Sequence, residues 1–260
     1  MQTSYHRAAL DRYRETRAEI LGCAPSDFDG HSLVIVPRPE STGGKFVMMA
    51  LTFGTGTVVS VEDAYLEWAK ANAPADHHYR AMFPNVMLQP LAEEATRRGE
   101  AFGWRAPNLS FLPGDIPSDA DVPAGLRAMP FAQEQRAEWL PSGEFHNALN
   151  KPTEPEDGSF RYGLALMDGE KPVAVAGGWD DCDGLIEIGV DVSREYRGRG
   201  LGEVVVSNFA AAIHARGGIP TYYCAPTNIR SHRNALACGF VPVASAAKAS
   251  RPPETVEPSH

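Results

Sequence analysis

The sequence has few of the features that mark secreted, metal-binding or membrane proteins. Its four cysteines, Cys23, Cys182, Cys224 and Cys238, are scattered and form no CxxC pair. This usage fits buried thiols in a reducing compartment, so we expect a cytoplasmic location and no metal. No apolar run approaches the roughly 20 residues of a membrane span, and the N-terminal stretch lacks the apolar core of a signal peptide. We therefore expect no contact with a membrane.

Positive charge is also scarce. The 260-residue chain has 24 Lys and Arg against 33 Asp and Glu, a formal net charge of −9. Nucleic-acid partners need basic surfaces, so we expect none, and the acidic balance weakly favours a cationic substrate. Hydrophobic residues make up 43% of the chain, which is ample for a globular core. The length allows one large domain or two.

The most informative stretch is LIEIGVDVSREYRGRGL, from Leu185 to Leu201. Apolar residues at 186, 188, 190 and 192 alternate with polar or small ones, which predicts a strand with one apolar face. A glycine-rich turn follows, and apolar residues at helical spacing predict a helix that begins at Leu201. A helix start leaves backbone N–H groups unpaired, glycines allow close approach, and arginines add charge. The turn is therefore suited to bind a phosphate or pyrophosphate.

The spacing of this turn excludes two common phosphate-binding motifs. Gly44-Lys45 is followed by Phe46, which does not fit a P-loop, and the dinucleotide fingerprint needs a glycine where this chain has Glu203. The turn fits Arg-x-x-Gly-x-Gly instead, from Arg197 to Gly202. In this motif the chain resembles the GNAT superfamily of N-acetyltransferases. In that family the loop wraps the pyrophosphate of acetyl-CoA, and the preceding strand splays from its neighbour to bind the pantetheine arm.

Residues further along the chain extend the resemblance over 155–245. A predicted strand at 219–225 is followed by Asn228, by Ser231 and by Gly239-Phe240, in the order and at the spacing typical of the family. The resemblance implies a mixed α+β fold, with a GNAT-type, mostly antiparallel twisted sheet flanked by helices. It also implies acetyl-CoA as co-substrate, bound by Val190, Val192, Arg197, Gly198, Arg199, Gly200, Leu201, Gly202, Asn228 and Ser231.

The resemblance also suggests catalytic roles. Glu187 is the candidate general base, and the backbone N–H of Val190 is the candidate donor to the thioester oxygen. The alternative for Glu187 is a solvent-facing or salt-bridged strand residue. Many family members carry a tyrosine four residues before the closing glycine, where this chain has Ala235. The proton source for the leaving thiolate is therefore open between water, Ser231 and another residue.

The chain as a whole is predicted to have three parts. These are an N-terminal α/β domain over 1–122, the GNAT domain over 123–247 and a loose tail over 248–260, with the Pro-, Asp- and Gly-rich stretch 113–125 as linker. The N-terminal domain is either a degenerate GNAT-like domain or an independent α+β domain that shapes the substrate cleft or forms a homodimer.

Several local elements are also predicted. We expect helices at 4–22, 61–71, 85–98 and 126–149, and strands at 32–37, 46–53, 57–61, 101–112, 160–167 and 173–179. Gly54-Thr-Gly56 and Asp168-Gly169-Glu170 are predicted hairpin turns, and Ser60 is a predicted helix cap.

Three functions from different classes remain. The first is an N-acetyltransferase that moves an acetyl group from acetyl-CoA to a primary amine of a small molecule by direct attack. The second is a CoA-binding protein of the same fold with a decayed or regulatory site, for which Ala235 is the best support. The third is a nucleotide- or phosphate-binding module of another fold, and the block from Asn228 to Phe240 argues against it.

Overall fold

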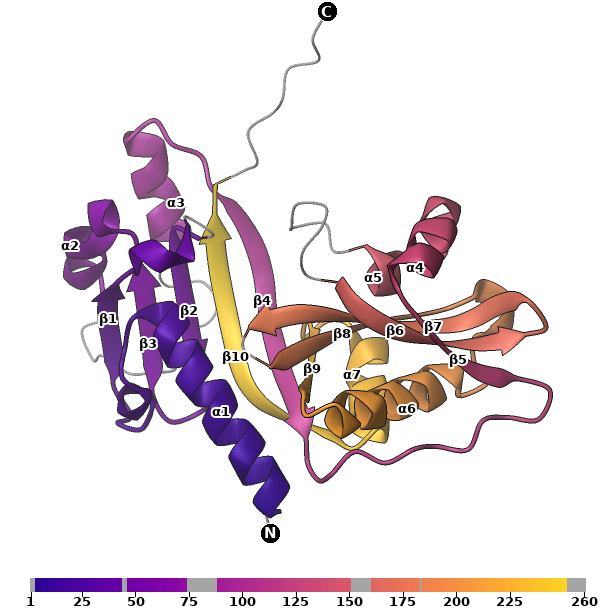
Figure 1. The fold of residues 1–260 in the computed structure, drawn as a ribbon. Coiled ribbons are helices and arrows are strands. Elements are labelled where there is room, and N and C mark those ends of the chain that lie inside the picture. The colour runs from indigo at the N-terminus through magenta and orange to yellow at the C-terminus, as the bar shows by residue number, and fades with distance from the viewer. Residues whose placement is uncertain (1–2, 44–45, 74–87, 151–159, 183, 252–260) are drawn as a thin grey trace, which may run out of the picture. The chain divides into compact units, whose positions relative to one another are not determined.

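The computed structural model describes residues 3–43, 46–73, 88–150, 160–182 and 184–251 (Figure 1). By its internal contacts the chain divides into two compact units. Unit 1 contains Met1–Tyr13 and Ser110–Pro242, and unit 2 contains Arg14–Leu109 and Val243–His260. Helix α1 (Ser4–Leu21) and strands β4 (Gly103–Pro113) and β10 (Phe240–Ser250) contribute residues to both units. The predicted domain boundary between residues 122 and 123 separates parts that are expected to fold independently. A division by internal contacts does not measure independent folding, so this boundary stays a prediction.

Unit 1 is built on a sheet with the strand order β4-β9-β8-β7-β6-β5. Strands β5 (Arg127–Phe131), β6 (Phe160–Asp168), β7 (Lys171–Cys182) and β8 (Leu185–Val192) are antiparallel neighbours, whereas β8 and β9 (Ile219–Cys224) run parallel. The predicted Asp168-Gly169 hairpin is confirmed. The prediction that 126–149 is helical is wrong for 127–131, because these residues pair with β6 as an edge strand.

Helices cover both faces of this sheet. On one face, α6 (Leu201–Ala215) buries the predicted apolar stripe, which includes Val205, Phe209 and Ile213. On the other face lie α4 (Gln133–Trp139) and α5 (His146–Leu149). Two adjacent glycines of β7 show the division, because an added Cβ on Gly178 would meet Phe209 of α6 and one on Gly177 would meet the backbone of α5. Helix α7 (Ile229–Ala237) packs against α6 and β9.

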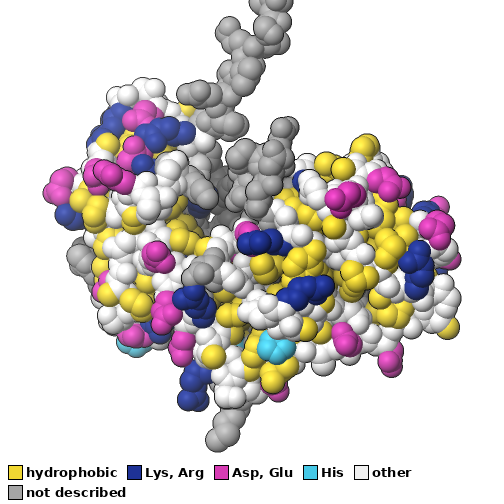
Figure 2. Space-filling model, in the orientation of Figure 1, with side chains coloured by type: hydrophobic (Ala, Val, Ile, Leu, Met, Phe, Trp, Pro, Cys, Tyr) yellow, Lys and Arg dark blue, Asp and Glu magenta, His cyan; other side chains and the backbone are white. Residues whose placement is uncertain are grey.

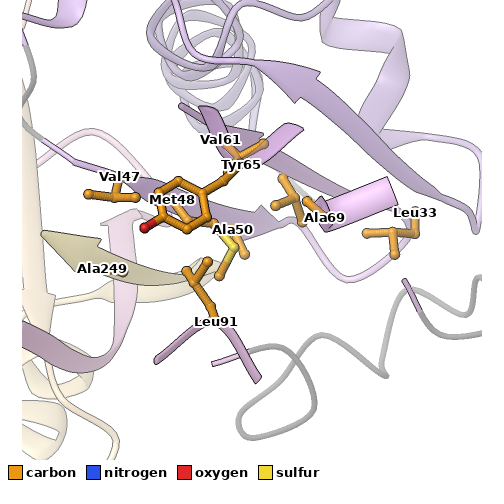
Figure 3. Close-up of a cluster of buried hydrophobic side chains, with 10 residues drawn as sticks. Leu33, Val47, Met48, Ala50, Val61, Tyr65, Ala69, Leu91 and Ala249 are labelled. Carbon is orange, nitrogen blue, oxygen red and sulfur yellow. The ribbon is translucent and has the colours of Figure 1, made fainter. Parts of the chain in front are cut away.

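Unit 2 contains a sheet with the order β1-β3-β2-β10. Strands β1 (Leu33–Pro37) and β3 (Thr57–Val61) are parallel, and β2 (Met48–Thr52) is antiparallel to both β3 and β10. Helices α2 (Asp63–Ala71) and α3 (Leu88–Arg97) complete a core that includes Met48, Val61, Tyr65 and Leu91 (Figure 3). The predicted hairpin at 54–56 is confirmed.

Two predictions fail in unit 2. Ser60 does not cap a helix, because strand pairing continues through Val61 and α2 begins only at Asp63. The tail does not begin at 248, since β10 extends to Ser250 and pairs with β2 from Ser245 to Ala249, and Ala249 is fully buried. The other tail residues, 252–260, lie outside the described residues.

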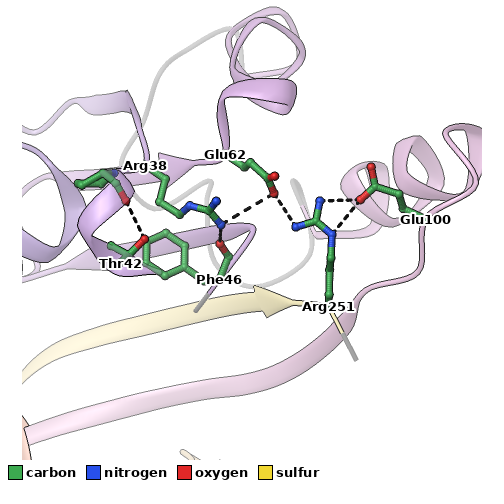
Figure 4. Close-up of polar contacts among 7 residues, drawn as sticks. Arg38, Thr42, Phe46, Glu62, Glu100 and Arg251 are labelled. Carbon is green, nitrogen blue, oxygen red and sulfur yellow. Dashed lines mark hydrogen bonds and ion pairs between the residues drawn. The ribbon is translucent and has the colours of Figure 1, made fainter. Parts of the chain in front are cut away.

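An ion-pair network adjoins the end of β10 (Figure 4). Arg251 places Nη1 2.8 Å from Glu62 Oε2 and Nη2 2.8 Å from Glu100 Oε2. Arg38 lies 3.8 Å from the same Glu62 oxygen and donates to the carbonyl of Phe46. The network therefore ties the last described residue to Glu62, which lies between β3 and α2, and to Glu100, which follows α3.

The described surface is mixed in charge. On the face shown in Figure 2, basic and acidic side chains are interspersed. Among the described helices, none combines the length and apolarity that a bilayer crossing requires. The described residues also contain no group of three or more His, Cys, Asp or Glu side chains suited to hold a metal ion.

Candidate active site

The central feature of unit 1 is the early end of pairing between the parallel strands β8 and β9. Their register consists of Leu185–Ile219, Ile186–Pro220 and Glu187–Thr221. Strand β8 continues to Val192 and β9 continues to Cys224. No residue of β8 after Glu187 is therefore paired with a residue of β9.

The register with β7 shows which backbone groups of β8 have no partner in a neighbouring strand. Val192 lies opposite Ala174, and the Ser193 N–H donates to the Val173 carbonyl at 2.9 Å. In an antiparallel pair this pattern makes Val192, and by alternation Val190, non-hydrogen-bonded with β7. Their N–H and C=O groups therefore point toward the β9 side, beyond the last pair. The Val192 carbonyl there accepts from Arg197 Nε at 3.1 Å.

The glycine-rich loop follows directly. A 3-10 turn at Arg194–Tyr196 leads to Gly198 and Gly200, whose φ angles of 77° and 75° lie in the left-handed region that favours glycine. Gly200 is the N-cap of α6, and its carbonyl accepts from the N–H groups of residues 203 and 204. The N–H groups of Leu201 and Gly202 lie before the first intrahelical hydrogen bonds, so they have no partner within α6. An added Cβ on Gly198 or Gly200 would meet no atom of the described residues within 4 Å, so the space next to each of these glycines is open.

Two arginines of the loop are held by neighbouring groups while their guanidinium ends stay exposed. Arg197 bonds to the end of β8, as described above. Arg199 donates from Nη2 to the Glu195 carbonyl at 3.2 Å, and its Cζ lies 4.8 Å from the centre of the Tyr196 ring. Both guanidiniums keep further donors that can bind an anion.

The predicted site residues of α7 have structural partners. Asn228 is the N-cap, and its Oδ1 accepts from the Ser231 N–H at 3.2 Å. Ser231 Oγ lies 2.8 Å from the hydroxyl of Tyr222, whose burial raises its pKa. Ala235, at the position of the family's tyrosine, is fully buried. Alternation in β9 could have placed Tyr222 on this side, but nothing in the sequence indicated its bond to Ser231.

Glu187 lies on the face of the sheet that α5 covers, opposite to α6. It is half-buried, and in the register it stands between Trp179 of β7 and Thr221 of β9. Trp179 Nε1 and Thr221 Oγ1 are buried and have no hydrogen-bond partner among the described residues. Two residues along the same face of β8, an added Cβ on Gly189 would lie 2.0 Å from the carbonyl oxygen of Asn147 in α5. Helix α5 therefore packs on the same face of β8 on which Glu187 lies.

Asp191 holds α5 in this position. Its Oδ2 accepts from the N–H groups of Asn147 and Ala148 at 2.6 and 3.0 Å, and its Oδ1 accepts from Asn147 Nδ2 at 2.8 Å. Opposite Gly189 in β7, Gly177 would place an added Cβ 1.9 Å from the Ala148 carbonyl oxygen. This contact was missed because the partners are 44 residues apart in sequence, and only the small residues at 177 and 189 hint at a close approach.

Comparison with known proteins identifies this part of the chain. Residues 127–240 match the family model described as the acetyltransferase (GNAT) family. This segment is a GNAT acetyltransferase domain. The predicted GNAT-type α+β fold is thereby confirmed, whereas the degenerate GNAT-like N-terminal domain lies outside the match and stays a prediction.

Solved structures also resemble the chain. A GCN5-related N-acetyltransferase from Kribbella flavida is 26% identical, with 64% of this chain and 66% of that chain covered and a TM-score of 0.43. A GCN5-related N-acetyltransferase-like protein from Streptococcus suis is 16% identical, with 65% and 69% covered and a TM-score of 0.46. A Drosophila protein is 14% identical, with 98% and 92% covered and a TM-score of 0.48. No curated protein matches the sequence.

Proposed function

We propose that the GNAT domain transfers an acetyl group from acetyl-CoA to the primary amine of a small molecule. The observation that carries this proposal is the unpaired edge of β8, followed at once by the glycine-rich start of α6. A pantetheine arm contains amides that can pair with a strand edge, and its pyrophosphate suits the N–H groups and arginines of the loop. The order of the two features along the chain matches the order of the two groups in acetyl-CoA.

The site residues then have the following roles. The Val190 N–H donates to the thioester oxygen and stabilises the negative charge that develops during attack. Glu187 lies three residues earlier, roughly 10 Å along the strand, so it accepts the proton of the amine through water. The proton that returns to the leaving thiolate comes from Ser231, from water or from another residue of the site. The free cysteines support a reducing, cytoplasmic setting.

The alternative is a CoA-binding protein with little transferase activity. The burial of Ala235 favours it, because no hydroxyl occupies the position where the family's tyrosine would stand. Turnover separates the two functions, since both require CoA binding but only the first releases free thiol when amines are supplied.

The test is calorimetric titration of the purified protein with acetyl-CoA, ATP and NADH. Micromolar binding of acetyl-CoA alone would support the proposal and justify a screen of amines for thiol release. Absence of binding would refute it.

A substitution at Gly200 tests the placement of the phosphates. Gly200→Glu adds a carboxylate where the pyrophosphate is expected, and it should abolish acetyl-CoA binding. The matched control is Gly125→Glu, because Gly125 has a similar left-handed φ of 86° and no atom of the described part of the chain lies within 4 Å of an added Cβ. Unchanged affinity of a folded Gly200→Glu variant would reject this placement.

A further inference from the structure

Tyr196 is the last residue of the turn between β8 and the glycine-rich loop, and it makes two kinds of contact. Its hydroxyl donates to Asp168 Oδ2 at 2.6 Å, and Asp168 is the last residue of β6. Its ring lies beneath the guanidinium of Arg199, with Cζ 4.8 Å from the ring centre. One side chain therefore joins the β6–β7 hairpin to an arginine of the loop.

An ion pair also joins the same two turns. Lys171 Nζ lies 3.1 Å from Glu195 Oε2 and 5.9 Å from the centre of the Tyr196 ring. The backbone carbonyl of Glu195 accepts from Arg199 Nη2 at 3.2 Å. Arg199 is thus restrained from two directions, by the Tyr196 ring and by the carbonyl of Glu195.

The Tyr196 hydroxyl keeps its proton and can therefore act as a hydrogen-bond donor to Asp168. Its hydrogen bond to Asp168 raises the pKa of Tyr196, so the hydroxyl remains protonated at neutral pH. The bond fixes the ring relative to the hairpin, and the face of the fixed ring attracts the guanidinium.

We propose that Tyr196 is a positioning residue for the phosphates of CoA, because it holds the Arg199 guanidinium beside the N-terminus of α6 before the ligand arrives. This inference rests on the proposed function. An unrestrained arginine loses rotamer freedom when it binds a phosphate, and a restrained one has already lost it. Tyr196 therefore strengthens binding without touching the ligand.

The proposal is tested with two ligands that differ in phosphate content. Acetyl-CoA contains the pyrophosphate, whereas S-acetylpantetheine has the arm alone, and its weak binding is measured by NMR titration. Tyr196→Phe removes the bond to Asp168 and should weaken acetyl-CoA binding about 3-fold. Tyr196→Leu also removes the ring and should weaken it about 10-fold. Neither change should alter the affinity for S-acetylpantetheine.

The double variant Tyr196→Leu/Arg199→Ala gives the decisive comparison. If Tyr196 acts through Arg199, the double variant binds acetyl-CoA about as well as Arg199→Ala alone. If the two losses multiply, or if S-acetylpantetheine weakens equally, the positioning role is overturned. Acetyl-CoA binding by the wild type with no loss in the Tyr196 variants overturns this role alone. A wild type that binds no acetyl-CoA overturns the proposed function as well.

Discussion

Replacing Gly189 with alanine should push α5 away from β8. The added Cβ would lie 2.0 Å from the Asn147 carbonyl oxygen and 2.9 Å from the Asn147 carbonyl carbon. An ordinary contact needs about 3.4 Å, so the two elements must separate by about 1.4 Å. Because the atoms met are backbone atoms, no side-chain rotation can relieve the overlap.

The cost has two parts. Overpacking of this kind costs about 1–3 kcal/mol. The shift also strains the three hydrogen bonds of Asp191 to Asn147 and Ala148, and because these groups are partly exposed we assign their loss about 1 kcal/mol in total. Alanine recovers roughly 0.5–1 kcal/mol, since glycine loses more freedom on folding. The expected loss in the free energy of unfolding is therefore about 1–3.5 kcal/mol.

The assay is urea unfolding combined with amide hydrogen exchange. Gly169→Ala is the control, because Gly169 has a φ of 57° and an added Cβ would have no described residue within 4 Å. It should lose about 1 kcal/mol from backbone conformation alone and leave exchange at Asn147 and Ala148 unchanged. A Gly189→Ala variant that is as stable as the wild type, with both amides still protected, would refute the packing of α5 on β8.

Three further predictions concern other parts of the chain. Glu187→Gln should lower kcat by a factor on the order of 10² near neutral pH, with acetyl-CoA affinity kept; a wild-type rate would assign the base elsewhere. Truncation after Ala247 should lower Tm by several degrees relative to truncation after Arg251, because it removes buried Ala249 and the Arg251 ion pairs; equal Tm values would show that this end adds no stability. Burial raises the pKa of Tyr5 from 10.0 to about 12. The unfolded chain therefore ionises first, and stability that is full below pH 10 falls by about 1–2 kcal/mol up to pH 12, after allowance for the partial exposure of Tyr5. Tyr5→Phe should remove this fall, and an unaltered pH dependence would contradict the assignment.

The parts of the fold that could be predicted are those with local signals. Alternation in β8, the Asp-Gly turn before β7 and the apolar stripe of α6 each depend on residues close in sequence. The loop glycines were predictable for the same reason, since their spacing from a strand to a helix start is itself the signal. The hydrogen-bond partners of the Arg197 and Arg199 side chains could not be predicted, because they depend on the conformation of the folded turn.

The predictions that failed concern elements that depend on distant partners. Strand β5 contains Pro130 and buries only Phe131, so its sequence shows no alternation, and it is a strand because β6 pairs with it. The end of β10 is rich in alanine, which is a poor strand former. It is extended because β2 supplies hydrogen-bond partners and Ala249 fits the core. The bond of Tyr196 to Asp168 likewise joins residues 28 apart.

The unpaired edge of β8 has a consequence for mutagenesis. The N–H groups of Val190 and Val192 belong to the main chain, so every residue except proline supplies them. Alanine scanning would therefore record both positions as tolerant, and a proline at 190 would remove the donor to the thioester oxygen. The most direct contacts proposed for the substrate depend on strand register, and the valine side chains can change while those contacts remain.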